Sequence, residues 1–124
     1  MIWLEIVGTL FDLANKKQEL SEKKRERLSE LFSKISTVID DVATKLENDE
    51  YPSKSCSIMQ DLSINIMLLV NSELPEDKAE ELAIKLNKVC FLEEEYAQRK
   101  SNDTIKNLRM ISGKFEALSM MYSL

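Results

Sequence analysis

The chain has 124 residues, of which 44% are hydrophobic and 31% charged, with only two glycines and two prolines and a formal net charge of −5. This length and composition suit one globular domain over residues 1–124 with long helices and short connections, and they exclude a disordered tail. The negative charge disfavours nucleic acid as a partner, since binding to a phosphate backbone depends on a clustered basic surface.

The opening segment and the cysteines bear on the cellular compartment. The segment IWLEIVGTLFDLANKKQ has no positively charged start and no small-residue cleavage site, and Glu5 and Asp12 interrupt its apolar run. We therefore expect neither a signal peptide nor a membrane span. Cys56 and Cys90 have no flanking motif, which fits a reducing compartment rather than a disulfide framework. Together these features predict a cytoplasmic protein that does not bind a membrane.

The first predicted element is an amphipathic helix over residues 2–17. Its apolar side chains follow helical spacing at Trp3, Ile6, Val7, Leu10, Phe11, Leu13 and Ala14. Ser21 is the predicted N-cap of the next helix, which we expect to end near Asn48. The apolar positions of this long helix form one stripe, at 28, 31, 32, 35, 38, 39, 42, 43 and 46. Acidic and basic residues occupy the opposite face in equal numbers, so no basic surface remains for nucleic acid.

A loop, NDEYPSKS, separates the long helix from a third predicted helix over residues 56–71. Asp61 is the one acidic residue in this third helix, and its apolar positions extend around a wide arc. This pattern predicts the most buried helix of the fold, with neighbours on several sides.

Two further helices are predicted in the C-terminal half. The fourth begins at Pro75, a residue that suits the first turn of a helix, and extends to about Ala97. The last helix is capped by Ser101 or Asn102. Its stripe consists of Ile105, Leu108, Ile111, Ser112, Phe115, Leu118 and Tyr122, with Met110, Ala117, Met120 and Met121 alongside. Gly113 in its interior suggests a close contact with another helix.

These elements predict an all-α fold, an up-down antiparallel helical bundle of four long helices plus the N-terminal amphipathic helix. We expect no strand. The predicted core contains one group of apolar residues drawn from the four long helices: Leu31, Ile35, Val38, Val42, Leu62, Ile66, Leu86, Val89, Leu108, Ile111 and Phe115.

The residue types required for most catalysis are missing from the sequence. It contains no histidine, which catalytic triads and the usual zinc and di-iron sites need, and no glycine-rich phosphate loop. Cys56 and Cys90 lie on apolar stripes, where a thiol packs as a small hydrophobe. The acidic run from Glu93 to Glu95 points in three directions around a helix and fits a solvated face. We expect no enzyme and no catalytic, cofactor-binding or metal-ligating residue.

Two features are candidates for a binding surface. The methionines Met59, Met67, Met110, Met120 and Met121 either line an adaptable groove or fill the core. The N-terminal helix either covers the bundle as a lid or presents Trp3, Ile6 and Leu10 to a partner, because amphipathic helices dock through residues three and four apart. Trp3, Ile6 and Leu10 are the predicted partner surface.

Four segments carry a resemblance to a known class of domain: IWLEIVGTLFDLA, RERLSELFSKISTVIDDVATKLE, YPSKSC and EDKAEELAIKLNKV. They resemble small helical effector-associated-type adaptor domains of bacterial, especially cyanobacterial, signalling and conflict systems. The resemblance implies protein–protein interaction without catalysis.

The predicted function is therefore that of a non-enzymatic interaction or adaptor module in a bacterial cytosolic system, with a protein partner that is another protein or a second copy of the chain. Two alternatives stay open. One is a small-ligand-binding or enzyme-accessory bundle, and the other is an acidic inhibitor or antitoxin-like protein that binds a basic partner.

Overall fold

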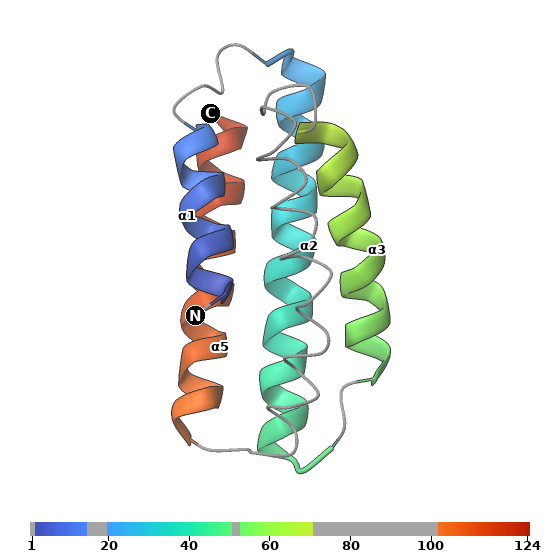
Figure 1. Ribbon diagram of the computed structural model, residues 1–124, viewed down its shortest axis with the longest axis vertical. Coiled ribbons are helices and arrows are strands. Elements are labelled where there is room, and N and C mark those ends of the chain that lie inside the picture. The colour runs from blue at the N-terminus through green and yellow to red at the C-terminus, as the bar shows by residue number, and fades with distance from the viewer. Residues whose placement is uncertain (1, 15–19, 51–52, 71–101) are drawn as a thin grey trace.

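The computed structural model describes residues 2–14, 20–50, 53–70 and 102–124 (Figure 1). These ranges contain the helices α1 (Ile2–Ala14), α2 (Glu22–Glu47), α3 (Ser53–Val70) and α5 (Asn102–Ser123). Nearly all of the described residues are helical and none of them is in a strand. The all-α prediction is therefore confirmed for this part of the chain, while the fourth predicted helix lies outside the described residues.

Both ends of α2 follow the prediction. The backbone N–H of Lys24 donates to the Ser21 hydroxyl at 3.2 Å, so Ser21 is the N-cap that satisfies one of the free donors of the first turn. At the other end Asn48 is the C-cap, and Asp49 adopts a left-handed conformation with a φ of 59°. Aspartate tolerates this region better than most residues, which allows the chain to leave the helix axis directly after Asn48.

The start of α3 differs from the prediction. We expected the SKS sequence at residues 53–55 to belong to the loop, but α3 already begins at Ser53, and Ser55 is buried. A proline excludes helical conformation mainly at the residue before it, and its own fixed φ suits a helix start. Polar residues that follow Pro52 can therefore form the first turn of the helix. The composition of the segment does not distinguish this turn from a loop.

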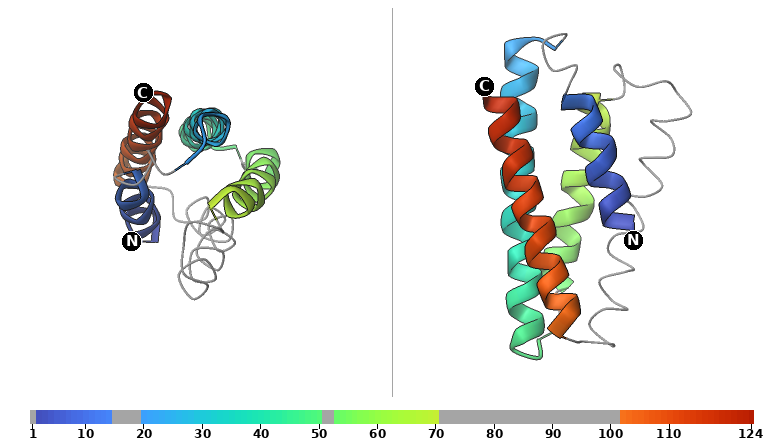
Figure 2. Two further views of the ribbon diagram at one scale, coloured as in Figure 1. Left: turned by 90° about the horizontal axis from the view of Figure 1, so that it is seen from above. Right: turned by 90° about the vertical axis from the view of Figure 1, so that its left-hand side faces the viewer.

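α2 is the central helix of the described fold. It packs against α5 on one side and α3 on the other, and α1 packs against α5. Seen from above, α5 and α3 lie on different sides of α2 and at an angle to each other, with α1 beside α5 (Figure 2, left). α2 runs in the opposite direction to α5, and α1 lies along the half of α5 that is nearer the C-terminus (Figure 1).

The core draws on every described helix, and most of the predicted core is confirmed. Buried members of the predicted set are Ile35, Val38, Val42, Leu62, Leu108, Ile111 and Phe115. Leu31 is only half-buried and packs at the edge of this cluster. The side chain of Ile66, and the residues Leu86 and Val89, lie outside the described part. Burial of one such side chain stabilises a fold by ~1.5–3 kcal/mol, so this cluster is the main source of stability.

The burial of α3 is described for only part of its side chains, so the prediction that it is the most buried helix stays a prediction. Among the described residues, the largest set of buried side chains belongs to α2. On α3, Met59 and Leu62 are buried, but Ile58, Ile64 and Leu68 are exposed. The described part of its wide apolar arc therefore extends beyond the face that meets α2.

Two serine pairs join α2 and α5 at their contact. The hydroxyl of Ser36 donates to the Ser112 carbonyl at 2.9 Å, and that of Ser112 donates to the Ser36 carbonyl at 2.8 Å. Ser29 and Ser119 repeat this arrangement at 2.8 and 2.7 Å, two helical turns away. A small side chain at each of these positions lets the backbones approach, and the reciprocal bonds fix the antiparallel register of the two helices.

An arginine on the surface extends the same contact. Arg109 of α5 contacts Glu47 through Nη2 at 2.9 Å and Asp40 through Nη1 at 3.4 Å, and it also donates to the Thr44 hydroxyl at 3.3 Å. Because these side chains are partly exposed, the ion pairs contribute little to stability. These contacts hold the Arg109 side chain against α2. Its positive charge is therefore directed toward α2 and away from the outer side of α5.

Candidate functional site

The described residues contain no cluster of candidate metal ligands. No three cysteine, aspartate or glutamate side chains gather there in a way that could hold a metal ion. The side chain of Cys56, together with Cys90 and the acidic run from Glu93 to Glu95, lies outside the described part. None of the described helices is both long and apolar enough to cross a bilayer.

The structure places one member of the predicted partner surface inside the fold. Leu10 is completely buried, and Val7 and Ala14 on the same side of α1 are buried as well. Leu10 therefore belongs to the core and is not part of an exposed patch. The side chains of Trp3 and Ile6 lie outside the described residues, so the role of this end of α1 stays a prediction.

The methionines divide between core and surface. Met59 is buried and Met121 is half-buried against the core, whereas Met110 and Met120 are exposed on α5. The side chain of Met67 lies outside the described part. The five residues thus do not line one groove, and the two exposed methionines share one helix.

These two methionines belong to an apolar stripe on the outer side of α5, which we call the α5 stripe. Its members are Met110, Gly113, Ala117, Met120 and Leu124, and all five are exposed. They follow one another at intervals of three and four residues, so they lie along one face of the helix. The exposed fractions of Met110, Met120 and Leu124 are 45%, 64% and 85%.

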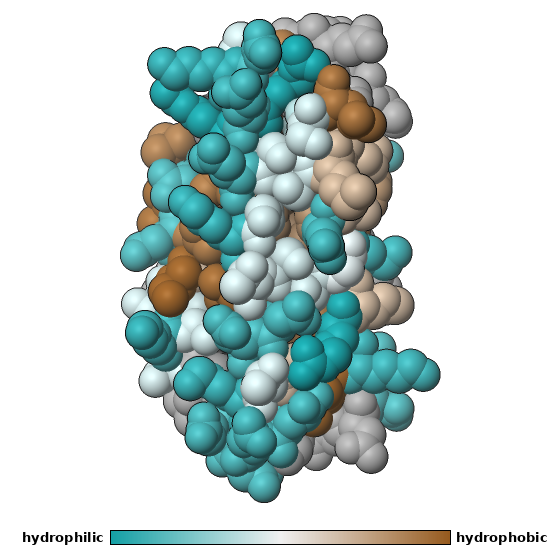
Figure 3. Space-filling view, turned by 180° about the vertical axis from the view of Figure 1, so that it is seen from behind, coloured by the Kyte–Doolittle hydropathy of each residue, from teal (hydrophilic) through white to brown (hydrophobic). Residues whose placement is uncertain are grey.

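The α5 stripe lies opposite the buried side of its helix. Ile111, Phe115 and Leu118 point into the core on the other side. In the right-hand view of Figure 2, α5 is toward the viewer, with α2 behind it and α1 beside it, and neither helix crosses its outer side. In the space-filling view from behind, brown and tan residues lie on the right-hand side, where α5 is, with teal residues between them (Figure 3). The described part of α5 is therefore apolar on two faces, of which only one packs against another described helix.

Gly113 lies in the middle of the α5 stripe. A Cβ atom built at this position would have no heavy atom of the described residues within 4 Å. The predicted close contact of Gly113 with another helix is thus not found in this part of the chain. Glycine in a helix interior costs ~1 kcal/mol relative to alanine, and no contact in the described fold compensates for this loss.

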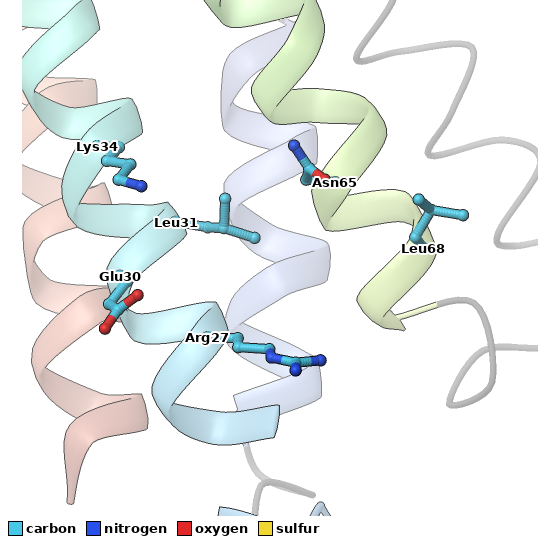
Figure 4. Close-up of a pocket in the computed structure, with 6 residues that line it drawn as sticks. All are labelled: Arg27, Glu30, Leu31, Lys34, Asn65 and Leu68. Atoms are coloured by element: carbon cyan, nitrogen blue, oxygen red, sulfur yellow. The ribbon is translucent and has the colours of Figure 1, made fainter. Parts of the chain in front are cut away.

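A second surface feature is an open groove of about 400 Å³ between α2 and α3. Its lining consists of Arg27, Glu30, Leu31, Lys34, Asn65 and Leu68 (Figure 4). Arg27 and Leu31 extend from α2 toward α3, while Leu68 points away from α2 (Figure 4). The lining combines two cations and one carboxylate with the apolar side chains of Leu31 and Leu68. The groove is open, so it lacks the enclosed walls of a typical small-molecule site.

Among the described ionisable groups, Tyr122 has a pKa that is clearly shifted by its environment. Burial raises the pKa of Tyr122 from 10.0 to about 12. Its ring packs against Phe32, with ring centroids 5.2 Å apart. Since this pKa lies far above neutral pH and the ring is in the core, Tyr122 has a packing role and is unsuited to acid–base catalysis.

No protein-family model, curated protein or solved structure matches the chain. The surface of the described helices is therefore the basis for a functional proposal. Most of the α5 stripe was visible in the sequence, since Met110, Ala117 and Met120 follow one another at helical spacing. Its exposure was not predicted, because the methionines were left open as core or groove residues.

Proposed function

We propose that the protein is a non-enzymatic protein–protein interaction module and that the α5 stripe is its docking surface. The observation that carries this proposal is the five-residue apolar face on the side of α5 opposite the core. A solvent-facing helix side normally carries charged and polar residues, and contiguous exposed apolar patches mark interaction sites.

The residue types of the α5 stripe suit a helical partner. Gly113 and Ala117 leave space for the close approach of another backbone. Met110 and Met120 flank them, and methionine adapts its shape to irregular surfaces. Residues spaced three and four apart are the usual anchors when a helix docks into a groove or against another helix. A partner that covered Gly113 would also give a physical reason for a glycine that the described fold does not use.

The resemblance to bacterial adaptor domains supports the same function. An adaptor needs a stable scaffold and a surface that another protein covers, and the buried core and the α5 stripe supply these. Within this proposal the module acts in the bacterial cytosol, and its partner is another protein or a second copy of the chain.

The alternative functions have less support from the described surface. A ligand-binding bundle requires an enclosed apolar cavity, whereas the groove between α2 and α3 is open and carries mixed charge. An inhibitor that binds a basic partner requires clustered carboxylates, whereas Asp40 and Glu47 are already engaged by Arg109.

The test compares two variants of α5 that add the same charge at different places. Ala117→Glu puts a carboxylate into the centre of the α5 stripe. Asn107→Glu puts one at an exposed position of the same helix outside the stripe. Both positions are exposed, so each variant should unfold in urea within about 0.5 kcal/mol of the wild type. Self-association is measured by sedimentation velocity, and association with other proteins by affinity capture from the cell of origin followed by titration of the purified pair.

We expect the wild type and Asn107→Glu to form the same assembly and Ala117→Glu to lose at least tenfold in affinity. Equal association of all three proteins would show that the α5 stripe is not the interface. A monomer that captures no partner in any form would contradict the interaction function itself.

We also propose the complete architecture to be an up-down antiparallel bundle of four long helices with α1 added to it. The long helices α2, α3 and α5 and the antiparallel contact of α2 with α5 support this arrangement. The remaining helix of the proposal falls within residues 71–101, which the structure does not describe.

A further inference from the structure

We draw no further inference here: the strongest candidate, the groove between α2 and α3, places Arg27 and Lys34 with Glu30 around the half-buried Leu31, and nothing in the structure shows what covers it.

Discussion

Ile35 lies near the middle of α2 and is 1% exposed. Ile35→Asp would place a carboxylate in an apolar site without a hydrogen-bond partner. Either the charge stays buried or the group takes up a proton, and both outcomes cost several kcal/mol against a total stability of ~5–15 kcal/mol. We expect this variant to lose cooperative unfolding, measured by circular dichroism during thermal and urea denaturation.

The matched control for this variant is Thr37→Asp, which adds the same group at an exposed position two residues along α2. It should retain a cooperative transition close to that of the wild type. If Ile35→Asp melted like the control, the assignment of the buried face of α2 would be wrong.

Tyr122 makes stability depend on pH in the alkaline range. Its pKa is raised to about 12 in the folded protein by burial, while the unfolded chain ionises near 10. Below pH 10 both states keep the proton and stability is unaffected. Between pH 10 and 12 only the unfolded state releases it, so stability falls as pH rises, by at most about 3 kcal/mol. Urea unfolding at pH 8, 9.5 and 11 measures this loss.

Tyr122→Phe separates this effect from other alkaline titrations, such as those of the lysines. The variant keeps the ring that packs on Phe32 and removes the ionisable group. Its stability should fall less between pH 9.5 and 11 than that of the wild type. An identical pH dependence of the two proteins would exclude Tyr122 as the cause.

At the residue scale, the sequence predicted burial well where a side chain lay at the centre of an apolar stripe. Ile35, Val42 and Ile111 are examples. It left the methionines open as core or groove residues, and of these Met59 is buried while Met120 is exposed. The position of the neighbouring helix decides between the two environments.

The contact between α2 and α5 depends on the serine pair of Ser36 and Ser112. Each hydroxyl donates to the other residue's carbonyl, and the two hydroxyl oxygens are 3.0 Å apart. We expect Ser36→Ala and Ser112→Ala each to cost about 1 kcal/mol, the usual net value of a hydrogen bond. The double variant should cost less than the sum, by about 0.5 kcal/mol or more, because the two residues are in direct contact and their effects are not independent.

Ser33→Ala is the control for the serine pair, since Ser33 is an exposed serine on the same helix. Its unfolding free energy, obtained from urea titration, should stay within about 0.5 kcal/mol of the wild type. Strictly additive effects of the two buried substitutions, each no larger than that of Ser33→Ala, would mean that the pair does not stabilise the contact.

At the element scale, helix ends were predictable where a side chain caps the helix, as Ser21 does. They were not predictable at Ser53, where nothing in the local sequence distinguishes a first helical turn from a loop. The serine pairs were also missed. Ser29 and Ser36 are seven residues apart, as are Ser112 and Ser119, and this shared spacing in two helices was the available signal.

The role of α1 in the whole molecule can be tested through Leu10. The buried face of α1 contributes Val7, Leu10 and Ala14 to the core. If α1 serves to cover the bundle, Leu10→Ala should lower the free energy of unfolding by ~2–5 kcal/mol through the lost contacts and the cavity that remains. Asp12→Ala, at an exposed position of α1, should change it little.

Calorimetry and analytical ultracentrifugation on the same samples distinguish this role from a role in binding. A covering role predicts lower stability of Leu10→Ala with unchanged association. A Trp3→Ala variant that loses association by ~2 kcal/mol or more while keeping the thermal midpoint would instead indicate that α1 contacts a partner.

At the scale of the whole molecule, the all-α class followed from the helical spacing of the apolar residues, the few glycines and prolines, and the absence of alternating segments. Which helices pack against each other did not follow from the sequence. For α5 the predicted core already contained Ile111 and Phe115, and both are buried. The sequence did not show that α2 is the helix they face. The bonds of Ser112 and Ser119 lie in this contact with α2.

The pairing of α2 with α5 also affects how the chain folds during synthesis. Ser36 and Ser112 are 76 positions apart, and Ser29 and Ser119 are 90 apart. Translation proceeds from the N-terminus at ~5–20 residues per second, so α2 leaves the ribosome several seconds before the helix that covers its apolar face. During that interval the stripe of α2 is available to chaperones and to other nascent chains. The core is completed only when α5 emerges.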